Sequence, residues 1–341
     1  MSARLNFASS VLAALSGVAY GAPFQNALLP AGVQADHVHT LWLIMLGTCT
    51  VVFIALFTAF VAALWRAPRS TEETPPQTSR TTGTERGATR AVALGAALSI
   101  AGLLGLLVAS VVTDRALAGL PLKDGLVIEV NGQQWWWQVT YAPGDPSRTF
   151  ETANELHIPV GRPVLLKLQS PDVIHSFWVP NLAPKKDLIP GRTLTLTLRA
   201  DTPGVYRGQC AEFCGYQHAK MAFLVIAEEP AQYEQWAQSQ HDSAKEPADA
   251  VRKRGRQVFM ESPCVMCHAI QGTRANARTG PDLTHVASRM TLAAGTLPNT
   301  RGHLAGWITN PQQVKPGANM PAVTLPADDL QALLTYLESL K

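Results

Sequence analysis

The chain has 341 residues, with 28 basic and 25 acidic side chains and a formal net charge of +3. This near balance argues against a protein built to bind nucleic acid, which needs a clear excess of basic residues. The length is sufficient for two domains of ordinary size together with membrane segments.

The first residues have the pattern of a secretory signal peptide. Arg4 precedes the apolar stretch 11–20, and Ala19-Tyr20-Gly21 places small residues where signal peptidase requires them. We predict that residues 1–21 are a cleaved signal peptide; the alternative is an uncleaved N-terminal segment. Cleavage would leave the mature N-terminus outside the cytoplasm.

Two long uncharged stretches follow, at 41–65 and 91–113. About 20 apolar residues are enough to cross ~30 Å of hydrocarbon, so each stretch predicts a transmembrane helix rather than a buried core helix. The connector 66–90 carries five arginines, and basic connectors stay in the cytoplasm. Residues 22–120 are therefore expected to form an N-terminal segment and a transmembrane hairpin. Everything after the hairpin would lie on the periplasmic side of a bacterial inner membrane.

Short runs of β-favouring residues are typical of the next segment, 122–228. They occur at 126–130, 164–168 and 194–198, and turn signals such as Pro203-Gly204 separate them. This spacing predicts an antiparallel β-sandwich or barrel. The polar segment 229–250 is expected to be a helix followed by a linker. Residues 251–341 are helical in pattern, and 327–340 carries leucines with a helical period.

One loop of the predicted β-domain concentrates soft metal ligands in the pattern Cys210-x3-Cys214-x3-His218-x2-Met221. Thiolate, imidazole and thioether groups suit copper, and two thiolates in one loop can bridge two ions. A second imidazole must come from elsewhere, and His175 is the best candidate. The alternatives are a disulfide between the cysteines and ordinary packing roles for His175 and Met221.

A second motif, Cys264-x2-Cys267-His268, is the attachment signal of a covalent c-type haem. The cysteines would form thioethers and His268 would bind the iron; the alternative is a redox dithiol. Met320 is the expected distal ligand, and Met290 is the second candidate. Methionine and histidine together raise the potential of a haem, which suits electron donation to copper.

Together these features resemble subunit II of the haem-copper cytochrome c oxidases, fused to a class I cytochrome c domain. The resemblance is carried by the hairpin, by the segments 135–137 and 172–192, and by the loop 210–221. It implies a multidomain fold: a two-helix transmembrane hairpin, a cupredoxin-like β-sandwich over 122–228 and an all-α cytochrome c domain over 251–341.

The resemblance also implies a dinuclear copper centre of the CuA type. Its side-chain ligands would be His175, Cys210, Cys214, His218 and Met221, with Glu212 binding through its backbone carbonyl. The carboxylate of Glu212 would reach a magnesium ion shared with subunit I. By the same resemblance, Trp135 lies on the surface where electrons arrive, and it is a candidate contact for the haem domain.

The implied function is to receive electrons for a membrane terminal oxidase. Electrons would pass from a periplasmic donor, a cytochrome c or a bc complex, to haem c, to CuA and to the haem of subunit I. That subunit, in complex with other oxidase subunits, would reduce oxygen to water and translocate protons. One alternative is the corresponding subunit of a CuA-containing nitric oxide reductase. Another is a copper-storage or copper-delivery protein, which would have no use for a haem.

The chain departs from this family in one respect. Many members carry a glutamate near the start of the second helix, at the mouth of a proton channel. Residues 91–113 contain no acidic residue, and Glu85 is the acidic residue nearest to the start of this stretch. A role in proton uptake is therefore not expected of this chain.

Overall fold

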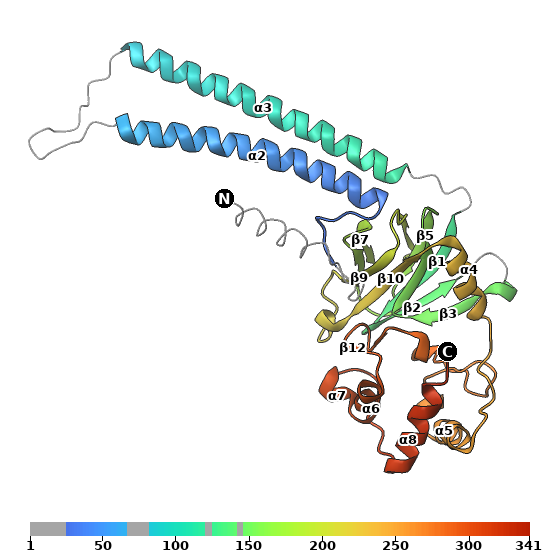
Figure 1. Cartoon of the computed structure of the whole chain (residues 1–341). Coiled ribbons are helices and arrows are strands. Elements are labelled where there is room, and N and C mark those ends of the chain that lie inside the picture. Colours follow the sequence, from blue (N-terminus) through green and yellow to red (C-terminus); the bar gives the residue numbers. More distant parts are fainter. Residues whose placement is uncertain (1–24, 67–81, 120–124, 142–145) are drawn as a thin grey trace, which may run out of the picture. The chain divides into compact units, whose positions relative to one another are not determined.

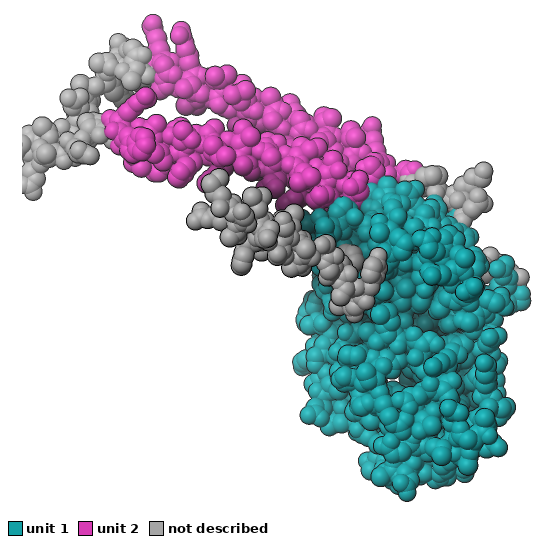
Figure 2. All heavy atoms as spheres, in the orientation of Figure 1, with its two compact units in different colours: residues 1–33, 122–341 teal, residues 34–121 magenta. Residues whose placement is uncertain are grey.

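The computed structural model describes residues 25–66, 82–119, 125–141 and 146–341 (Figure 1). The predicted signal peptide, 1–21, lies outside the described residues. The chain divides into two compact units, residues 1–33 with 122–341 and residues 34–121 (Figure 2).

Two long helices, α2 (Val33–Arg66) and α3 (Thr82–Ala118), account for the membrane segment. They have 34 and 37 residues, which at a rise of 1.5 Å per residue gives about 50 Å each, well over the ~30 Å of hydrocarbon. Their apolar windows have none of their surface buried inside the protein. Helices that are apolar all round and uncovered by their own chain need lipid or other subunits around them. The prediction of two apolar helices is confirmed.

The segment after the helices folds into two five-stranded sheets (Figure 1). The first sheet has the strand order β3 (Phe150–Ala153), β2 (Trp136–Tyr141), β1 (Leu126–Gln133), β5 (Val164–Gln169) and β8 (Leu194–Leu198). The second has the order β4 (Glu155–Pro159), β10 (Ala222–Glu228), β9 (Gly204–Cys210), β6 (His175–Val179) and β7 (Ala183–Leu188).

Alternation of buried and half-buried residues explains why these segments pair as a sandwich. Strand β1 alternates strictly between buried and half-buried positions, so one face enters the core. The three predicted strands become β1, β5 and β8, which are neighbours in one sheet. The sheets are mixed rather than purely antiparallel, because β1 pairs with β5 and β4 with β10 in parallel. These partners are separated by other strands, so the chain can return in the same direction.

The C-terminal region is helical, with α5 (Ala250–Glu261), α6 (Arg301–Thr309), α7 (Pro311–Val314) and α8 (Ala327–Leu337), and a small ribbon of β11 (Thr291–Leu292) and β12 (Leu297–Pro298). Helix α4 (Pro230–Ser239) precedes it. The predicted C-terminal helix is confirmed as α8. Helices α5 and α8 cross at Gly255, where an added Cβ would lie 2.0 Å from the carbonyl oxygen of Ala332. Only glycine permits this close approach, which brings the two helices together around Phe259 and Tyr336.

Candidate metal centre

Two adjacent strands of the second sheet position the predicted copper ligands. His175 is the first residue of β6 and Cys210 is the last residue of β9, and these strands pair antiparallel. Antiparallel pairing brings the start of one strand beside the end of the other. The loop between β9 and β10 then carries the remaining candidates, so the chain itself holds them at the same end of the sandwich.

The sulfur and nitrogen atoms of these residues form one connected cluster. The Sγ atoms of Cys210 and Cys214 lie 3.8 Å apart. The Nδ1 of His175 is 3.8 Å from the Cys210 sulfur, and the Nδ1 of His218 is 3.7 Å from the Cys214 sulfur. The Met221 sulfur lies 3.8 Å from that of Cys214. All five predicted side chains are therefore brought together, three of them fully buried within a possible metal site: His175, Cys210 and Cys214.

The backbone carbonyl of Glu212 also faces this cluster. Its oxygen lies 3.2 Å from the Cys210 sulfur, whereas the Glu212 carboxylate points away and lies 3.6 Å from the ammonium of Lys185. The carbonyl and the carboxylate of one residue are thus available to different partners. Thiolates, imidazoles, a thioether and a carbonyl oxygen make a donor set that fits copper.

Several neighbours fix the orientation of the His175 ring. Its Nε2 lies 2.9 Å from the Asp172 carboxylate, an arrangement that sets the tautomer and leaves Nδ1 to face the sulfurs. An added Cβ at Gly132 would come within 3.1 Å of the imidazole, so a larger residue there would displace the ring. The Trp137 indole meets the ring edge to face at a centroid distance of 6.2 Å. His175 itself is 0 % exposed.

The thiol pair is electrostatically asymmetric. A hydrogen bond from Cys214 lowers the pKa of Cys210 to about 3, against the opposing effect of burial. The same hydrogen bond, together with burial, raises the pKa of Cys214. Cysteine binds metal ions as a thiolate, so metal binding to this pair is coupled to the release of protons.

The haem motif follows α5. Cys264 lies in a short 3₁₀ turn, Pro263–Met266, and the Nδ1 of His268 lies 2.7 Å from the carbonyl oxygen of Pro281. This contact orients the ring and leaves Nε2 as the atom available to an iron. Burial lowers the pKa of His268, which keeps the imidazole neutral as a ligand must be.

The two candidate methionines differ in their surroundings. Met320 packs against the hydrophobic core of the helical domain, as do Cys264 and Leu283. Met290 is 43 % exposed, and its amide donates a hydrogen bond to the Glu155 carboxylate of the β-domain, 2.6 Å away. The placement of Met320 favours it as the distal ligand.

Orphaned polar atoms provide a test of whether the helical domain fits a haem. Within the described residues, both ring nitrogens of His285, the Nε of Arg289 and the hydroxyl of Thr291 are buried without a hydrogen-bond partner. Such groups are costly unless something satisfies them. Arg289 also lies close enough to lower the pKa of His268 further. A prosthetic group that carries carboxylates fits this environment.

Trp135 connects the two sites. Its indole N–H donates a hydrogen bond of 2.9 Å to the carbonyl oxygen of Cys214, and Gln134 donates to the same oxygen at 2.8 Å. On its other side, the carbonyl of Trp135 accepts a 2.6 Å hydrogen bond from Lys315 of the helical domain. Asp172, Gly132 and Lys315 were not predicted as site residues, and nothing in their local sequence distinguishes them.

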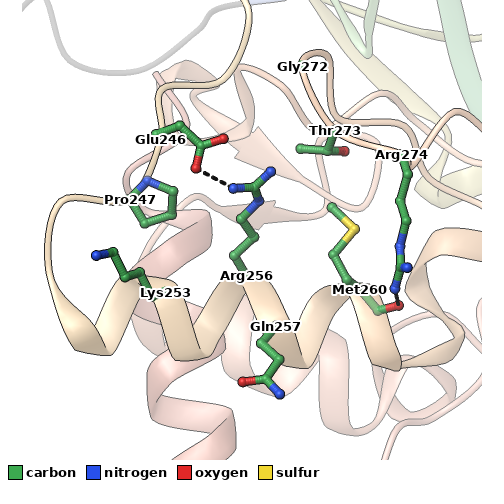
Figure 3. Close-up of a pocket in the computed structure, with 9 residues that line it drawn as sticks. All are labelled: Glu246, Pro247, Lys253, Arg256, Gln257, Met260, Gly272, Thr273 and Arg274. Atoms are coloured by element: carbon green, nitrogen blue, oxygen red, sulfur yellow. Dashed lines mark hydrogen bonds and ion pairs between the residues drawn. The ribbon is translucent and has the colours of Figure 1, made fainter.

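The helical domain also has a surface cavity of about 580 Å³, between α5 and the segment 272–274 (Figure 3). In it Arg256 pairs with Glu246, and Arg274 donates to the carbonyl of Met260 at 3.2 Å (Figure 3). None of the predicted copper or haem ligands lines this cavity. It is a polar surface depression separate from the metal sites.

Comparison with known proteins agrees with this architecture. Residues 143–228 match the family described as cytochrome c oxidase subunit II, periplasmic domain, and residues 252–341 match the cytochrome c family. Cytochrome c oxidase subunit 2 of Alkalihalophilus pseudofirmus is 36% identical over 93% of this chain and 91% of its own length. That of Bacillus subtilis is 30% identical over 65% of this chain and 64% of its own length.

Among solved structures, the periplasmic domain of subunit II of the cytochrome oxidase of Bradyrhizobium japonicum is 29% identical, with a TM-score of 0.32; the match covers 34% of this chain and 92% of that domain. The relative from Alkalihalophilus pseudofirmus spans the membrane helices and both outer domains of this chain. The chain therefore belongs to the cytochrome c oxidase subunit II family, as a membrane-anchored member in which a cytochrome c domain follows the periplasmic domain.

Proposed function

We propose that this chain is the subunit through which electrons enter a terminal oxidase of a bacterial inner membrane, with both metal-binding domains on the periplasmic side. Electrons from a periplasmic donor would reach haem c, then a dinuclear CuA centre, then the haem of subunit I, where oxygen is reduced to water. The observation that carries this proposal is the six-residue ligand cluster, linked through Trp135 to a domain with a haem-attachment motif.

The copper centre and the haem would each be held by its own set of residues. His175, Cys210, Cys214, His218 and Met221 would bind copper through side chains, and Glu212 through its carbonyl oxygen. Cys264 and Cys267 would anchor the haem through thioether bonds, and His268 and Met320 would bind its iron. When bound, both groups accept and release single electrons; the buried, hydrogen-bonded surroundings of His175 limit rearrangement around the copper.

The Glu212 side chain could bind a second kind of metal ion at the copper loop. Its carboxylate is about half exposed and pairs only with the exposed Lys185 among the described residues. Such an exposed ion pair contributes little, about 0–1 kcal/mol, so the carboxylate can exchange Lys185 for another cation. We propose a magnesium ion held jointly with subunit I, which would place the copper loop against that subunit.

Replacing Trp135 with glutamine should slow haem-to-copper electron transfer at least tenfold, because the indole donates a hydrogen bond to the copper loop and lies beside Gly317 of the helical domain. Flash photolysis of the assembled complex measures this rate. Trp135→Phe is the matched control: it keeps an aromatic ring but loses the N–H bond to Cys214, and should be slowed less. A glutamine variant as fast as the wild type would exclude Trp135 from the path.

Purification of the intact complex tests the function. The chain should co-purify with a haem-copper subunit I that consumes oxygen and is inhibited by cyanide. Electron paramagnetic resonance should show a mixed-valence dinuclear copper beside a c-type haem. Reduction of nitric oxide instead of oxygen would assign the chain to a nitric oxide reductase. A mononuclear copper signal, or copper that chelators remove readily, would instead indicate storage or delivery.

A further inference from the structure

The helical domain contacts the copper loop through two segments, 293–296 and 314–317. The Ala222 amide donates to the carbonyl of Ala294 at 3.0 Å, and the Gln217 amide group donates to the carbonyl of Pro316 at 2.6 Å. Gln217 immediately precedes His218, and Ala222 immediately follows Met221. Hydrogen bonds therefore join the helical domain to both ends of the stretch 217–222, which carries the proposed copper ligands His218 and Met221.

The first contacting segment has an unusual backbone. Ala293 and Ala294 have φ angles of 52° and 57°, in the left-handed region that residues with a Cβ avoid. Conformations of this kind persist only where the surroundings enforce them, and they concentrate at functional contacts. Here the Ala294 carbonyl accepts from Ala222 of the copper domain. The Ala293 carbonyl accepts within the helical domain, from Lys315 at 3.3 Å and from the Thr296 hydroxyl at 2.7 Å.

Lys315 lies at the centre of this interface and is 3 % exposed. Its ammonium donates to the carbonyl of Trp135 at 2.6 Å and to that of Ala293 at 3.3 Å. Lysine is almost never fully buried without partners, and here both partners are backbone carbonyls. Burial lowers the pKa of Lys315 to about 7, with Cys214 opposing this shift and Lys220 adding to it. Burial of an ammonium group costs free energy, so packing alone does not explain why a lysine occupies this position.

The chain beyond Lys315 leads directly to the proposed haem ligand. An added Cβ at Gly317 would lie 3.8 Å from the edge of the Trp135 indole, so the backbone of the helical domain passes beside that edge of the ring. Met320 follows three residues later. The segment 315–320 thus carries the hydrogen bond of Lys315 to Trp135, the glycine beside the indole and the proposed distal haem ligand.

We propose that Lys315 is a positioning residue. Its hydrogen bond to the Trp135 carbonyl keeps the segment 315–320 against Trp135, and the haem bound by Met320 is thereby held at a fixed place relative to the copper loop. This inference rests on the proposed function, because it assumes that electrons pass between the two sites. Lys315 is not a proposed ligand of the copper or of the haem. It acts through the backbone of Trp135 and through the loop that ends at Met320.

The test compares two variants of the assembled complex, Lys315→Met and Arg278→Met. Arg278 is the matched control, since it also joins the helical domain to the β-domain, through a 3.2 Å ion pair with Glu151, but its side chain is 75% exposed. Lys315→Met should slow haem-to-copper transfer in flash photolysis at least tenfold, because the Trp135 carbonyl loses its donor across the interface and the docked population falls. Arg278→Met should change the rate less than threefold.

Further measurements distinguish a loss of docking between the two domains from damage to the copper centre or the haem. Copper and haem content should equal those of the wild type in Lys315→Met. Both reduction potentials are measured as well, because Lys315 acts electrostatically on Cys214, so that a change in driving force is separated from a change in docking. Hydrogen exchange at the peptide containing Ala222 should accelerate, since that amide is bonded across the interface. Should the methionine variant fail to load both groups, Lys315→Gln, which keeps an N–H donor of shorter reach, takes its place with the same expected outcome.

The outcomes are distinct. A slowed rate with faster exchange at Ala222 supports the proposal. An unchanged rate in Lys315→Met, or an equal loss in Arg278→Met, overturns the role of Lys315 and leaves the proposed function intact. Absence of haem-to-copper transfer in the wild type itself would overturn the proposed function, and the role of Lys315 with it.

Discussion

Cys214→Ser should leave at most one copper ion per chain and abolish the mixed-valence dinuclear signal in electron paramagnetic resonance. The two cysteine sulfurs lie 3.8 Å apart, and Cys214 is also the sulfur nearest to both His218 and Met221. A serine hydroxyl is a poor ligand for copper. Loss of a residue that merely supports a ligand already costs about 10–100-fold in metal affinity, so loss of a shared thiolate should cost more. Metal analysis and spectroscopy of the purified complex check this.

The matched control is Cys49→Ser. Cys49 is an exposed cysteine on α2, apart from the ligand cluster, and its replacement should leave the copper content at two ions per chain. Two bound copper ions with an intact signal in Cys214→Ser would show that the cysteine pair does not bridge the centre. The haem band should be unchanged in both variants, because the haem motif lies in the other domain.

Met320→Leu should lower the reduction potential of the haem and change its spectrum to that of an iron without a sulfur ligand. Axial ligands set haem potentials over roughly 0.8 V, and methionine raises the potential relative to nitrogen ligands. A fall on the order of 0.1–0.2 V makes reduction by the donor less favourable by about two to three powers of ten, at 59 mV per tenfold change. Redox titration followed by absorbance measures the shift.

Met290→Leu is the control for this experiment, since Met290 is the other candidate ligand. Met290 is 43 % exposed, and the interface uses its backbone amide rather than its sulfur. The potential and spectrum should therefore match those of the wild type. A shifted potential in Met290→Leu, with no shift in Met320→Leu, would reverse the assignment of the distal ligand.

The elements that were predicted well are those governed by local pattern. The uncharged stretches 41–65 and 91–113 lie within α2 and α3, which extend further because polar residues can continue a helix beyond the hydrocarbon. The leucine repeat near the C-terminus predicted α8, and the β-favouring runs predicted β1, β5 and β8. The parallel pairing of β1 with β5 was not predictable, because strand partners depend on the whole topology rather than on the strands themselves.

The candidate site divides in the same way. Cys210, Cys214, His218 and Met221 lie within twelve residues, so their proximity follows from the chain alone. His175 was proposed from chemistry, and the pairing of β6 with β9 brings it to the cysteines. The Asp172 contact that orients its ring could not be predicted, since it depends on the direction of one side chain.

The soft-ligand loop, the haem-attachment motif and the two apolar helices could be predicted, because each is encoded by residues that are neighbours along the chain. The way in which the two outer domains meet could not be predicted from such local patterns. Lys315 and Trp135 are 180 positions apart, and their contact depends on the packing of separately folded domains. A buried ammonium between two carbonyls is stable only in that packed arrangement, so its role emerges only when both domains are in place.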